Sequence, residues 1–316
     1  MNDVAVLVNP AAGGGRASKI WERLQRQVTA LGEARCIVAD SEANAVRELD
    51  QQLRDEKLRT VIAVGGDGTV HLVVQRLLAS GRGTDVPFAF VPAGTGADLA
   101  RGLGIPKRPA EALQAAMTQC ASPTRPPRPM DLIEVAFGDG ERRFCVNVAS
   151  TGLSGALVNE VNARQHRGPW VYLFLTLKGL LRYEPAAVRV VVDGREIYEG
   201  GIFLAAVANS SFFGRGMKVA PEARVDDGEA DIVVIPPVPL AHVPWRLLQF
   251  YTGRHVRLPF ISVTRGREVR VEPQTPEAPL RFEIDGEAAP VTSRLAAPEA
   301  QAITLRVLPA AVRVLA

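Results

Sequence analysis

The sequence predicts an α/β domain with a parallel sheet, followed by a mostly antiparallel β-sandwich domain. Over the first third of the 316-residue chain, short apolar runs alternate with helical patterns, which is typical of parallel sheets. After residue 131 the apolar runs become more frequent, and Asp-Gly pairs that favour two-residue hairpin loops appear among them. Between these regions, residues 123–131 contain four prolines, which interrupt helices and central strands.

The elements of the first domain follow from the spacing of apolar residues. Unbroken apolar runs predict buried strands, and apolar residues three or four positions apart predict helices. The predicted strands span residues 4–8, 35–39, 60–64 and 88–91, and the predicted helices span 18–31, 42–55 and 109–117. We place the boundary near Met130, so that the first domain covers residues 1–130.

The second domain, residues 131–301, is expected to be rich in strands. Hairpin turns are predicted at the Asp-Gly pairs that begin at Asp139, Asp193 and Asp285. The predicted strands span 132–137, 143–148, 188–192, 202–208, 231–235, 256–263, 268–271 and 280–284, with helices over 154–164 and 170–183. This order favours an antiparallel sandwich interrupted by two helices.

Composition excludes several classes of protein. The 37 Lys and Arg residues nearly balance the 34 Asp and Glu residues, so bulk charge predicts no nucleic-acid partner. The longest apolar run, residues 202–208, is shorter than the ~20 residues of a membrane-spanning helix. Three distant cysteines without a CxxC pair indicate neither a disulfide framework nor a zinc site. We therefore expect a cytoplasmic protein.

Three glycine-containing loops each follow a predicted strand of the first domain. They cover residues 9–15, 65–69 and 92–98. Ligands of open parallel sheets bind at the carboxyl ends of the strands, where glycine backbone and helix N-termini favour anions. None of the loops matches GxxxxGK[ST] or GxGxxG. Together they predict a site for phosphate groups of another kind.

Asp67 lies between Gly66 and Gly68 in the middle loop. A carboxylate beside phosphates is repelled unless it meets a metal ion, a metal-bound water or a hydroxyl proton. Its position therefore suggests phosphoryl transfer. The alternative is that Asp67 only caps a helix that starts at Thr69, because Asp is a favourable N-cap residue.

Several longer strings show a resemblance that covers residues 4–314. The strings VNPAAGGGRA, VIAVGGDGTVHLVV, VPAGTGADLARGLGIP, NVASTGLSG, VANSSFFGRGMKVAPEARVDDGEADIVV and EIDGEA, in this order, resemble the diacylglycerol kinase catalytic domain family, which includes sphingosine kinases and bacterial lipid kinases. The most specific feature is GGDGT and GTG combined with the later DDG and DGE motifs.

The resemblance implies a fold like that of NAD kinases and diacylglycerol kinases, in which residues 302–316 return to the first domain. It also implies an ATP-dependent kinase that phosphorylates the hydroxyl of a lipid, either diacylglycerol, a related glycerolipid or a sphingoid base. Two alternatives stay open. NAD kinases share the GGDG loop, and a nucleotide-sensing protein could keep the loops without turnover.

The resemblance also assigns roles to residues. Glu287 is expected to be the general base, with Asp285 assisting, and Asp131 to join Asp67 in a carboxylate network. A Mg²⁺ ion is expected at the side chain of Asp227 and the backbone carbonyls of Arg224 and Glu229, since Mg²⁺ prefers hard oxygen ligands. Simple Asp-Gly turns are the alternative at Asp227 and Asp285. The nucleotide is expected to contact Asn9, Gly13, Gly14, Ser41, Gly65, Gly66, Asp67, Gly68, Thr69, Val70, His71 and Thr95.

Two positions depart from the family pattern. Ala97 stands where the family commonly has the Asn of GTGND, so the hydrogen bond of that amide is lost. Ser41 lies in a segment that usually contains Thr, and it could supply the hydroxyl instead.

A lipid kinase must reach a substrate in a bilayer. Basic residues flank aromatic residues over 164–182 and again over 245–260, a pattern that suits contact with anionic headgroups. We therefore expect transient peripheral contact with the inner membrane face. The alternative is a helix packed on the sandwich with ordinary charged edges. The sequence leaves the oligomeric state open, with a dimer as one option.

Overall fold

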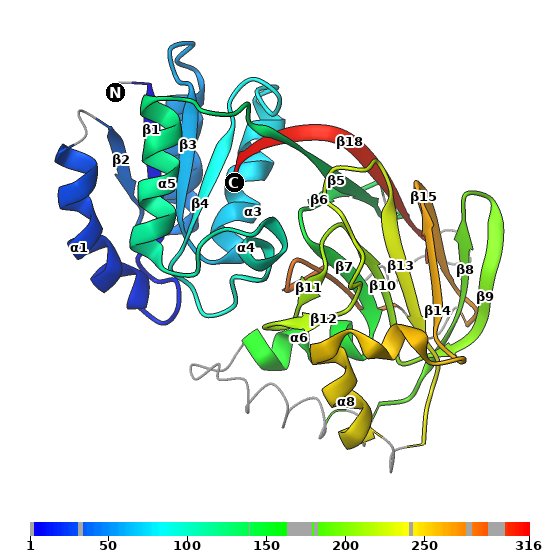
Figure 1. Ribbon diagram of the computed structural model, residues 1–316. Coiled ribbons are helices and arrows are strands. Elements are labelled where there is room, and N and C mark those ends of the chain that lie inside the picture. Colours follow the sequence, from blue (N-terminus) through cyan, green and yellow to red (C-terminus); the bar gives the residue numbers. More distant parts are fainter. Residues whose placement is uncertain are drawn as a thin grey trace. The chain divides into compact units, whose positions relative to one another are not determined.

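The computed structural model describes residues 3–30, 34–138, 140–162, 179, 183–239, 243–275, 280–289 and 301–316. The chain forms two compact units, unit 1 with Met1–Asp131 and Ala310–Ala316, and unit 2 with Leu132–Pro309. It passes between them within β5 (Arg128–Ala136) and β18 (Ile303–Leu315) (Figure 1). The prolines were expected to exclude this segment from the sheet, but Pro129 is the second residue of β5, a position near a strand start where proline is tolerated.

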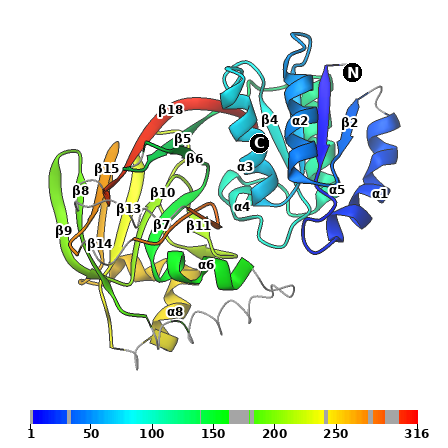
Figure 2. The ribbon, with the colours of Figure 1, turned by 180° about the vertical axis from the view of Figure 1, so that it is seen from behind.

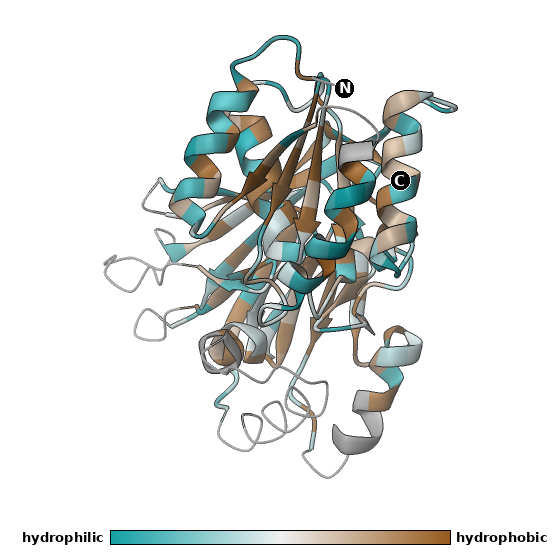
Figure 3. Ribbon diagram, turned by 90° about the vertical axis from the view of Figure 1, so that its left-hand side faces the viewer, coloured by the Kyte–Doolittle hydropathy of each residue, from teal (hydrophilic) through white to brown (hydrophobic). Residues whose placement is uncertain are grey.

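Unit 1 contains a parallel sheet with the strand order β2-β1-β3-β4, extended by the last residues of β18 beside β4. Every residue of β1, β3 and β4 is buried, as expected for strands covered by helices on both faces. Figure 3 shows the same strands as the hydrophobic centre of this unit. The strands are β1 Val4–Val8, β2 Arg35–Val38, β3 Thr60–Gly65 and β4 Phe88–Pro92.

Helices cover both faces of this sheet. Figure 1 shows α5 in front of the strands, and Figure 2, seen from behind, shows α2 in front of them. Trp21 and Leu24 of α1 share a buried cluster with Leu113 and Met117 of α5. α3 starts at Asp67, two residues before the predicted start. The helices are α1 Arg16–Ala30, α2 Glu42–Leu53, α3 Asp67–Ala79, α4 Asp98–Leu103 and α5 Pro109–Ala121.

Unit 2 is a sandwich of two sheets. In one, β18 is followed by β15, β8 and β9, while β5 pairs with β18 and β6 pairs with β5. The other sheet has the order β14-β13-β10-β7-β16-β17. Its core combines Val190 and Val271 of the first sheet with Val207, Ile232 and Phe282 of the second. The strands are β6 Arg142–Cys145, β7 Val148–Gly152, β8 Ala186–Val192, β9 Arg195–Ile202, β10 Leu204–Ala208, β11 Phe212–Phe213, β12 Met217–Lys218, β13 Ala230–Ile235, β14 Ser262–Gly266, β15 Glu268–Pro273, β16 Phe282–Ile284 and β17 Glu287–Ala288.

Three predicted strands differ from the observed ones. The run 143–148 is divided between β6 and β7, and the run 202–208 is divided because Ile202 ends β9 and Leu204 begins β10. The predicted strand 256–263 starts within the 3-10 helix η2 (Arg254–Arg257), whose His255 is buried, and only its end lies in β14.

Of the helices in unit 2, α6 (Leu153–Asn162) lies where the sequence predicts it, whereas α8 (Val243–Thr252) was not predicted. The predicted helix over 170–183 lies outside the described residues except at positions 179 and 183. No helix among the described residues is long and apolar enough to span a membrane.

Candidate functional site

The three glycine loops of unit 1 lie at one edge of its sheet. Gly65 at the end of β3 is in register with Pro92 at the end of β4. The N–H groups of Ala93 and Gly94 both donate to the Gly65 carbonyl, at 2.7 and 2.8 Å. On the other side, the Asn9 N–H donates to the Val64 carbonyl at 3.0 Å. Backbone hydrogen bonds therefore join the loops that follow β1, β3 and β4.

Close backbone contacts explain why these loops contain glycine. A Cβ atom added to Gly94 would lie 2.6 Å from the Cα atom of Gly66, and one added to Gly13 would lie 3.2 Å from the carbonyl oxygen of Ala93. Gly13 also has a φ of +65°, which glycine adopts readily. We refer to residues 9–15, 65–69 and 92–98 together as the glycine edge.

Asp67 connects two loops of the glycine edge. Its Oδ2 accepts a hydrogen bond from the Asp98 N–H at 3.2 Å, and its Oδ1 accepts one from the Leu99 N–H at 3.3 Å. These are the first two residues of α4. Asp67 therefore caps α4, whereas α3 has Gly66 as its N-cap residue and no side-chain cap. The alternative that Asp67 caps the helix near Thr69 is therefore wrong, and the catalytic role of Asp67 stays a prediction.

The other residues expected at the nucleotide contribute in different ways. The side chains of Thr69 and Val70 are buried, and their N–H groups donate to the Gly66 carbonyl at 3.0 and 3.3 Å. The Ser41 hydroxyl accepts from the Asn44 N–H at 3.3 Å and so caps α2. The exposed positions of the glycine edge include Gly14, Gly68 and Thr95. His71 is partly exposed, and its Nε2 lies 3.3 Å from Nε2 of Gln75.

In unit 2, Asp285 and Gly286 form a two-residue turn between β16 and β17, with φ angles of 53° and 83°. The Asp285 carboxylate accepts hydrogen bonds from the N–H groups of Val146 and Asn147, each at 2.8 Å, and of Val148 at 3.2 Å. These bonds fix the turn against the connection between β6 and β7. They also explain why the run 143–148 divides into two strands.

Asn147 extends this connection to a third motif. The Asn209 N–H donates to the Asn147 carbonyl at 2.8 Å, and the Asn209 side-chain amide donates to the Val146 carbonyl at 2.9 Å. The Asn147 side-chain amide donates to the Phe212 carbonyl at 2.8 Å. The structure therefore brings together NVASTGLSG, VANSSFF and EIDGEA, which are far apart in the sequence.

Glu283 is a candidate residue that the sequence analysis missed. It is 6% exposed, and its Oε1 accepts a hydrogen bond from the Ser150 hydroxyl at 2.6 Å, while Ser150 Oγ lies 2.8 Å from Ser154 Oγ. Burial raises the pKa of Glu283 to about 7, with Ser150 opposing the rise and Asp285 and Glu287 adding to it. The available signal was alternation along β16, because Phe282 and Ile284 face the core and the residue between them faces the opposite side.

Glu287 and Asp131 have contrasting surroundings. Glu287 is the first residue of β17, and it is exposed. Asp131 is 2% exposed, and its Oδ1 accepts a hydrogen bond from the Ala310 N–H at 2.7 Å. Ala310 has a φ of 49°, so Asp131 supports an uncommon backbone conformation within β18. The expected network of Asp131 with Asp67 stays a prediction.

The acidic loop expected to bind Mg²⁺ has a protein cation beside it. Asp227 Oδ1 accepts from the Glu229 N–H at 3.2 Å, and Asp227 Oδ2 accepts from the Arg265 guanidinium. Nε of Arg224 lies 3.6 Å from Oδ1 of Asp226. Among the described residues, no cluster of His, Cys, Asp and Glu side chains is arranged to hold a metal. Because the permanently charged guanidinium of Arg265 already bonds to Asp227, these residues do not fit the expected ion.

Asp231 belongs to the same group of acids. The residue is 4% exposed, and its Oδ2 lies 3.6 Å from the Nε of Arg265. Burial raises the pKa of Asp231 to about 6, with Arg265 opposing the rise and neighbouring acids such as Asp227 adding to it. Partial desolvation lowers the pKa of Arg265, but the carboxylates of Asp227, Asp231 and Glu229 outweigh this effect and raise the pKa above its ordinary value.

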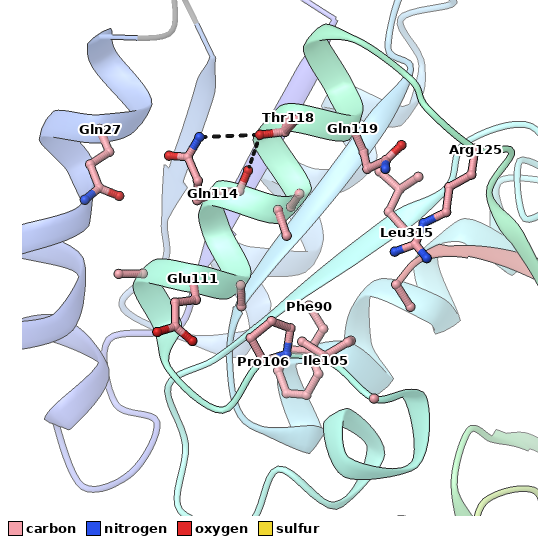
Figure 4. A pocket seen from close by; sticks show the side chains of 16 residues that line it. Gln27, Phe90, Ile105, Pro106, Glu111, Gln114, Thr118, Gln119, Arg125 and Leu315 are labelled. Carbon is pink, nitrogen blue, oxygen red and sulfur yellow. Dashed lines mark hydrogen bonds between the residues drawn. The ribbon is translucent and has the colours of Figure 1, made fainter.

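A separate cavity of about 750 Å³ lies on unit 1 (Figure 4). Its walls include Gln27 of α1, Gln114 and Gln119 of α5, and Leu315 of β18. No residue expected at the nucleotide lines it. The cavity is therefore separate from the loops at which the sequence predicts the phosphate site, and that site stays a prediction.

Two family models match the chain. "Diacylglycerol kinase catalytic domain" matches residues 3–135, and "YegS C-terminal NAD kinase beta sandwich-like domain" matches residues 147–316. The two matches together include the glycine edge, the acidic loop and the turn at Asp285.

Relatives and solved structures agree with these models. "Diacylglycerol kinase" of Mycobacterium tuberculosis (strain ATCC 25618 / H37Rv) is 28% identical over 270 residues, 85% of this chain and 84% of the relative. "Probable lipid kinase YegS-like" of Stenotrophomonas maltophilia (strain K279a) is 31% identical over 246 residues, 76% of this chain and 75% of the relative.

Among solved structures, a diacylglycerol kinase from Bacillus anthracis str. Sterne superposes with a TM-score of 0.72 at 20% identity, covering 99% of this chain and 96% of that one. Yeast NADH kinase complexed with NADH gives a TM-score of 0.53 at 10% identity, covering 99% and 82%. These two likenesses confirm the predicted fold class. The family models and the relatives establish that the chain belongs to the diacylglycerol kinase catalytic domain family and carries a YegS-type β-sandwich-like C-terminal domain.

Proposed function

We propose that this protein is a lipid kinase that transfers the γ-phosphoryl group of ATP to the hydroxyl of diacylglycerol or a related lipid. Family membership and the names of the relatives support the lipid kinase class. The observation that carries the proposal is the convergence of three glycine loops at one sheet edge, with Asp67 fixed between two of them.

The donor is assigned to the glycine edge. The 13-residue helix α3 begins there, directly after Gly66. The first N–H groups of a helix lack intrahelical acceptors and carry partial positive charge, so they suit phosphate oxygens. Glycine at positions 66, 68 and 94 keeps side chains away from this backbone. Mg²⁺ enters this proposal as part of the donor, bound to the phosphates of ATP.

The acceptor chemistry is assigned to the turn at Asp285. Glu287 is exposed and accepts the proton of the lipid hydroxyl, while that oxygen forms a bond to the γ-phosphorus and the bond from phosphorus to the ADP oxygen breaks. Asp285 already accepts three backbone N–H groups. We therefore assign Asp285 the role of positioning Glu287.

Membrane contact is assigned to one face of α8 and η2. Leu248 is 61% and Tyr251 39% exposed, and the following Arg254 and Arg257 are also exposed. Neither arginine has an ion-pair partner among the described residues. Exposed apolar groups beside arginines suit an anionic bilayer surface. The other expected segment, residues 164–182, lies outside the described residues except at position 179.

Contacts of Phe250 and His255 hold α8 and η2 in place. The ring of Phe250 stacks on His255 with 4.0 Å between the ring centroids. His255 Nε2 lies 3.0 Å from the Val219 carbonyl oxygen. Replacing Leu248 and Tyr251 with serine should therefore reduce sedimentation with phosphatidylserine vesicles without unfolding the protein. Val38→Ser, on an exposed position of β2, is the matched control and should sediment like the wild type.

The activity is tested with γ-labelled ATP and two acceptors, NAD and diacylglycerol in mixed micelles. We expect label in the organic phase. Label found only in an aqueous phosphorylated dinucleotide would favour an NAD kinase-like enzyme. Nucleotide binding without transfer to any lipid of a broad panel would favour a nucleotide-sensing protein.

A further inference from the structure

We infer that the guanidinium of Arg265 takes the place of a divalent cation at the acidic loop 226–229, so that this loop binds no Mg²⁺ in this protein. The arrangement concerns unit 2 alone and does not depend on which lipid or nucleotide the enzyme uses.

Three carboxylates surround the Arg265 guanidinium. Asp231 and Arg265 are directly paired across β13 and β14, which brings the side chain to the acidic loop. Its Nη2 hydrogen-bonds Asp227 Oδ2 and lies 3.4 Å from Glu229 Oε2, while its Nε lies 3.6 Å from Asp231 Oδ2. Carboxylates from one loop and one strand therefore converge on a single cation.

Charge balance explains why a cation is needed at this place. The Asp231 carboxylate is almost fully buried, and its Oδ2 has no hydrogen-bond partner among the described residues. A buried carboxylate is costly unless a positive charge accompanies it. Arg265 supplies that charge permanently, because guanidinium stays protonated in proteins.

The same contacts oppose the binding of a second cation at Asp227. One of its oxygens accepts from Arg265 and the other from the Glu229 N–H. Mg²⁺ requires near-octahedral oxygen ligands at about 2.1 Å, and the permanent charge of a guanidinium hydrogen-bonded to the same carboxylate would repel it. Removing the Arg265 charge should consequently create a divalent-cation site.

The test is thermal unfolding of the protein without nucleotide or lipid, in EDTA and in increasing MgCl2 or CaCl2 at constant ionic strength. A ligand that binds only the folded state raises the midpoint temperature of unfolding, and the rise depends on ligand concentration as binding to a site does. We expect no saturable rise for the wild type, a lowered midpoint for Arg265→Gln in EDTA, and a saturable rise for this variant with Mg²⁺ or Ca²⁺.

The matched control is Arg306→Gln, which removes the 2.8 Å ion pair with Glu268 elsewhere in unit 2. It should show no rise with either metal. Arg265→Lys, which keeps a positive charge, should resemble the wild type more closely than Arg265→Gln does. Two results would overturn the inference. One is a saturable rise of the unfolding midpoint in the wild type at the same or a lower metal concentration than in Arg265→Gln. The other is the absence of any rise in Arg265→Gln.

A second measurement covers the case in which Arg265→Gln does not fold. Mn²⁺ binding to the wild type is followed by electron paramagnetic resonance, with Asp227→Asn for comparison. We expect the wild type and Asp227→Asn to bind the same amount of Mn²⁺, because the wild-type loop holds none. A wild-type site that disappears in Asp227→Asn would contradict the role of Arg265, whatever activity the enzyme shows.

Discussion

Two turns of unit 2 have the same sequence and the same backbone but different surroundings. Asp193-Gly194 connects β8 to β9, and Asp285-Gly286 connects β16 to β17. Their φ angles are 47° and 79° in the first turn and 53° and 83° in the second. The Asp-Gly pair therefore determines the hairpin conformation at both places.

The aspartates of the two turns also bond in the same way. Asp193 accepts from the N–H groups of Arg267 at 3.0 Å and Glu268 at 2.9 Å, much as Asp285 accepts from the connection between β6 and β7. What differs is the flanking chemistry. The exposed Arg195 follows the first turn, whereas carboxylates lie on both sides of the second. The anchoring hydrogen bonds of Asp285 therefore do not distinguish a structural turn from a functional one, and the flanking residues do.

The largest expected difference between the turns is catalytic. Glu287→Gln should reduce kcat for diacylglycerol phosphorylation by at least ~100-fold, the lower range for loss of a general base. Arg195→Gln changes the equivalent position after the other turn and should leave kcat unchanged. Both residues are exposed, so both variants should unfold at wild-type temperatures. Near-normal turnover in Glu287→Gln would move proton acceptance to another residue.

The next effect is the pH dependence of stability caused by Glu283. Its pKa of about 7 in the folded protein is above its ordinary value of 4.5, so between these values the folded state holds a proton that the unfolded state releases. Stability should fall as pH rises through this interval, by on the order of 3 kcal/mol from this group. Urea unfolding at several pH values should show a shallower fall for Glu283→Gln. Identical pH profiles would mean that Glu283 does not titrate as described.

A smaller effect separates anchoring from catalysis. Asp193→Asn and Asp285→Asn each weaken hydrogen bonds to backbone N–H groups, and each should lower the free energy of unfolding by about 1–3 kcal/mol. Only Asp285→Asn should also lower kcat, because only that turn positions Glu287. Equal kcat values in both variants, at a temperature where both are folded, would remove the positioning role from Asp285.

The smallest expected effect concerns the glycines. Gly194 and Gly286 have φ angles of +79° and +83°, and an added Cβ would meet nothing within 4 Å at either position. Alanine should therefore cost about 1 kcal/mol at both, from backbone conformation alone. Chemical denaturation of the two variants measures this directly. A clearly larger loss at Gly286 would reveal a constraint that the turn geometry does not explain.

The sequence was most informative where local pattern and burial coincide. The apolar runs of β1, β3 and β4 predict those strands closely, since every residue in them is buried. β9 was missed because much of it is polar and exposed. The predicted strand 256–263 overlaps the end of η2, whose His255 contacts the distant Val219, a contact that local pattern does not reveal. Tertiary contacts outweigh local preference in such segments.

In the candidate site too, local pattern predicts some features, and contacts between distant residues determine the others. The spacing of the glycine loops predicts their shared sheet edge, because parallel strands end together. The sequence could not reveal that Asp67 bonds to residues of α4, or that Arg265 of β14 reaches Asp227 in the acidic loop. Those contacts join residues more than 30 positions apart, and they depend on the register of the folded sheets.

The most direct measurement is a crystal structure of the protein with a non-hydrolysable ATP analogue. The phosphates should accept hydrogen bonds from backbone N–H groups of the glycine edge, next to Gly66, Gly68 and Thr95. Phosphates bound elsewhere, for example in the cavity beside α5 (Figure 4), with the glycine edge empty, would contradict the assignment of the donor site.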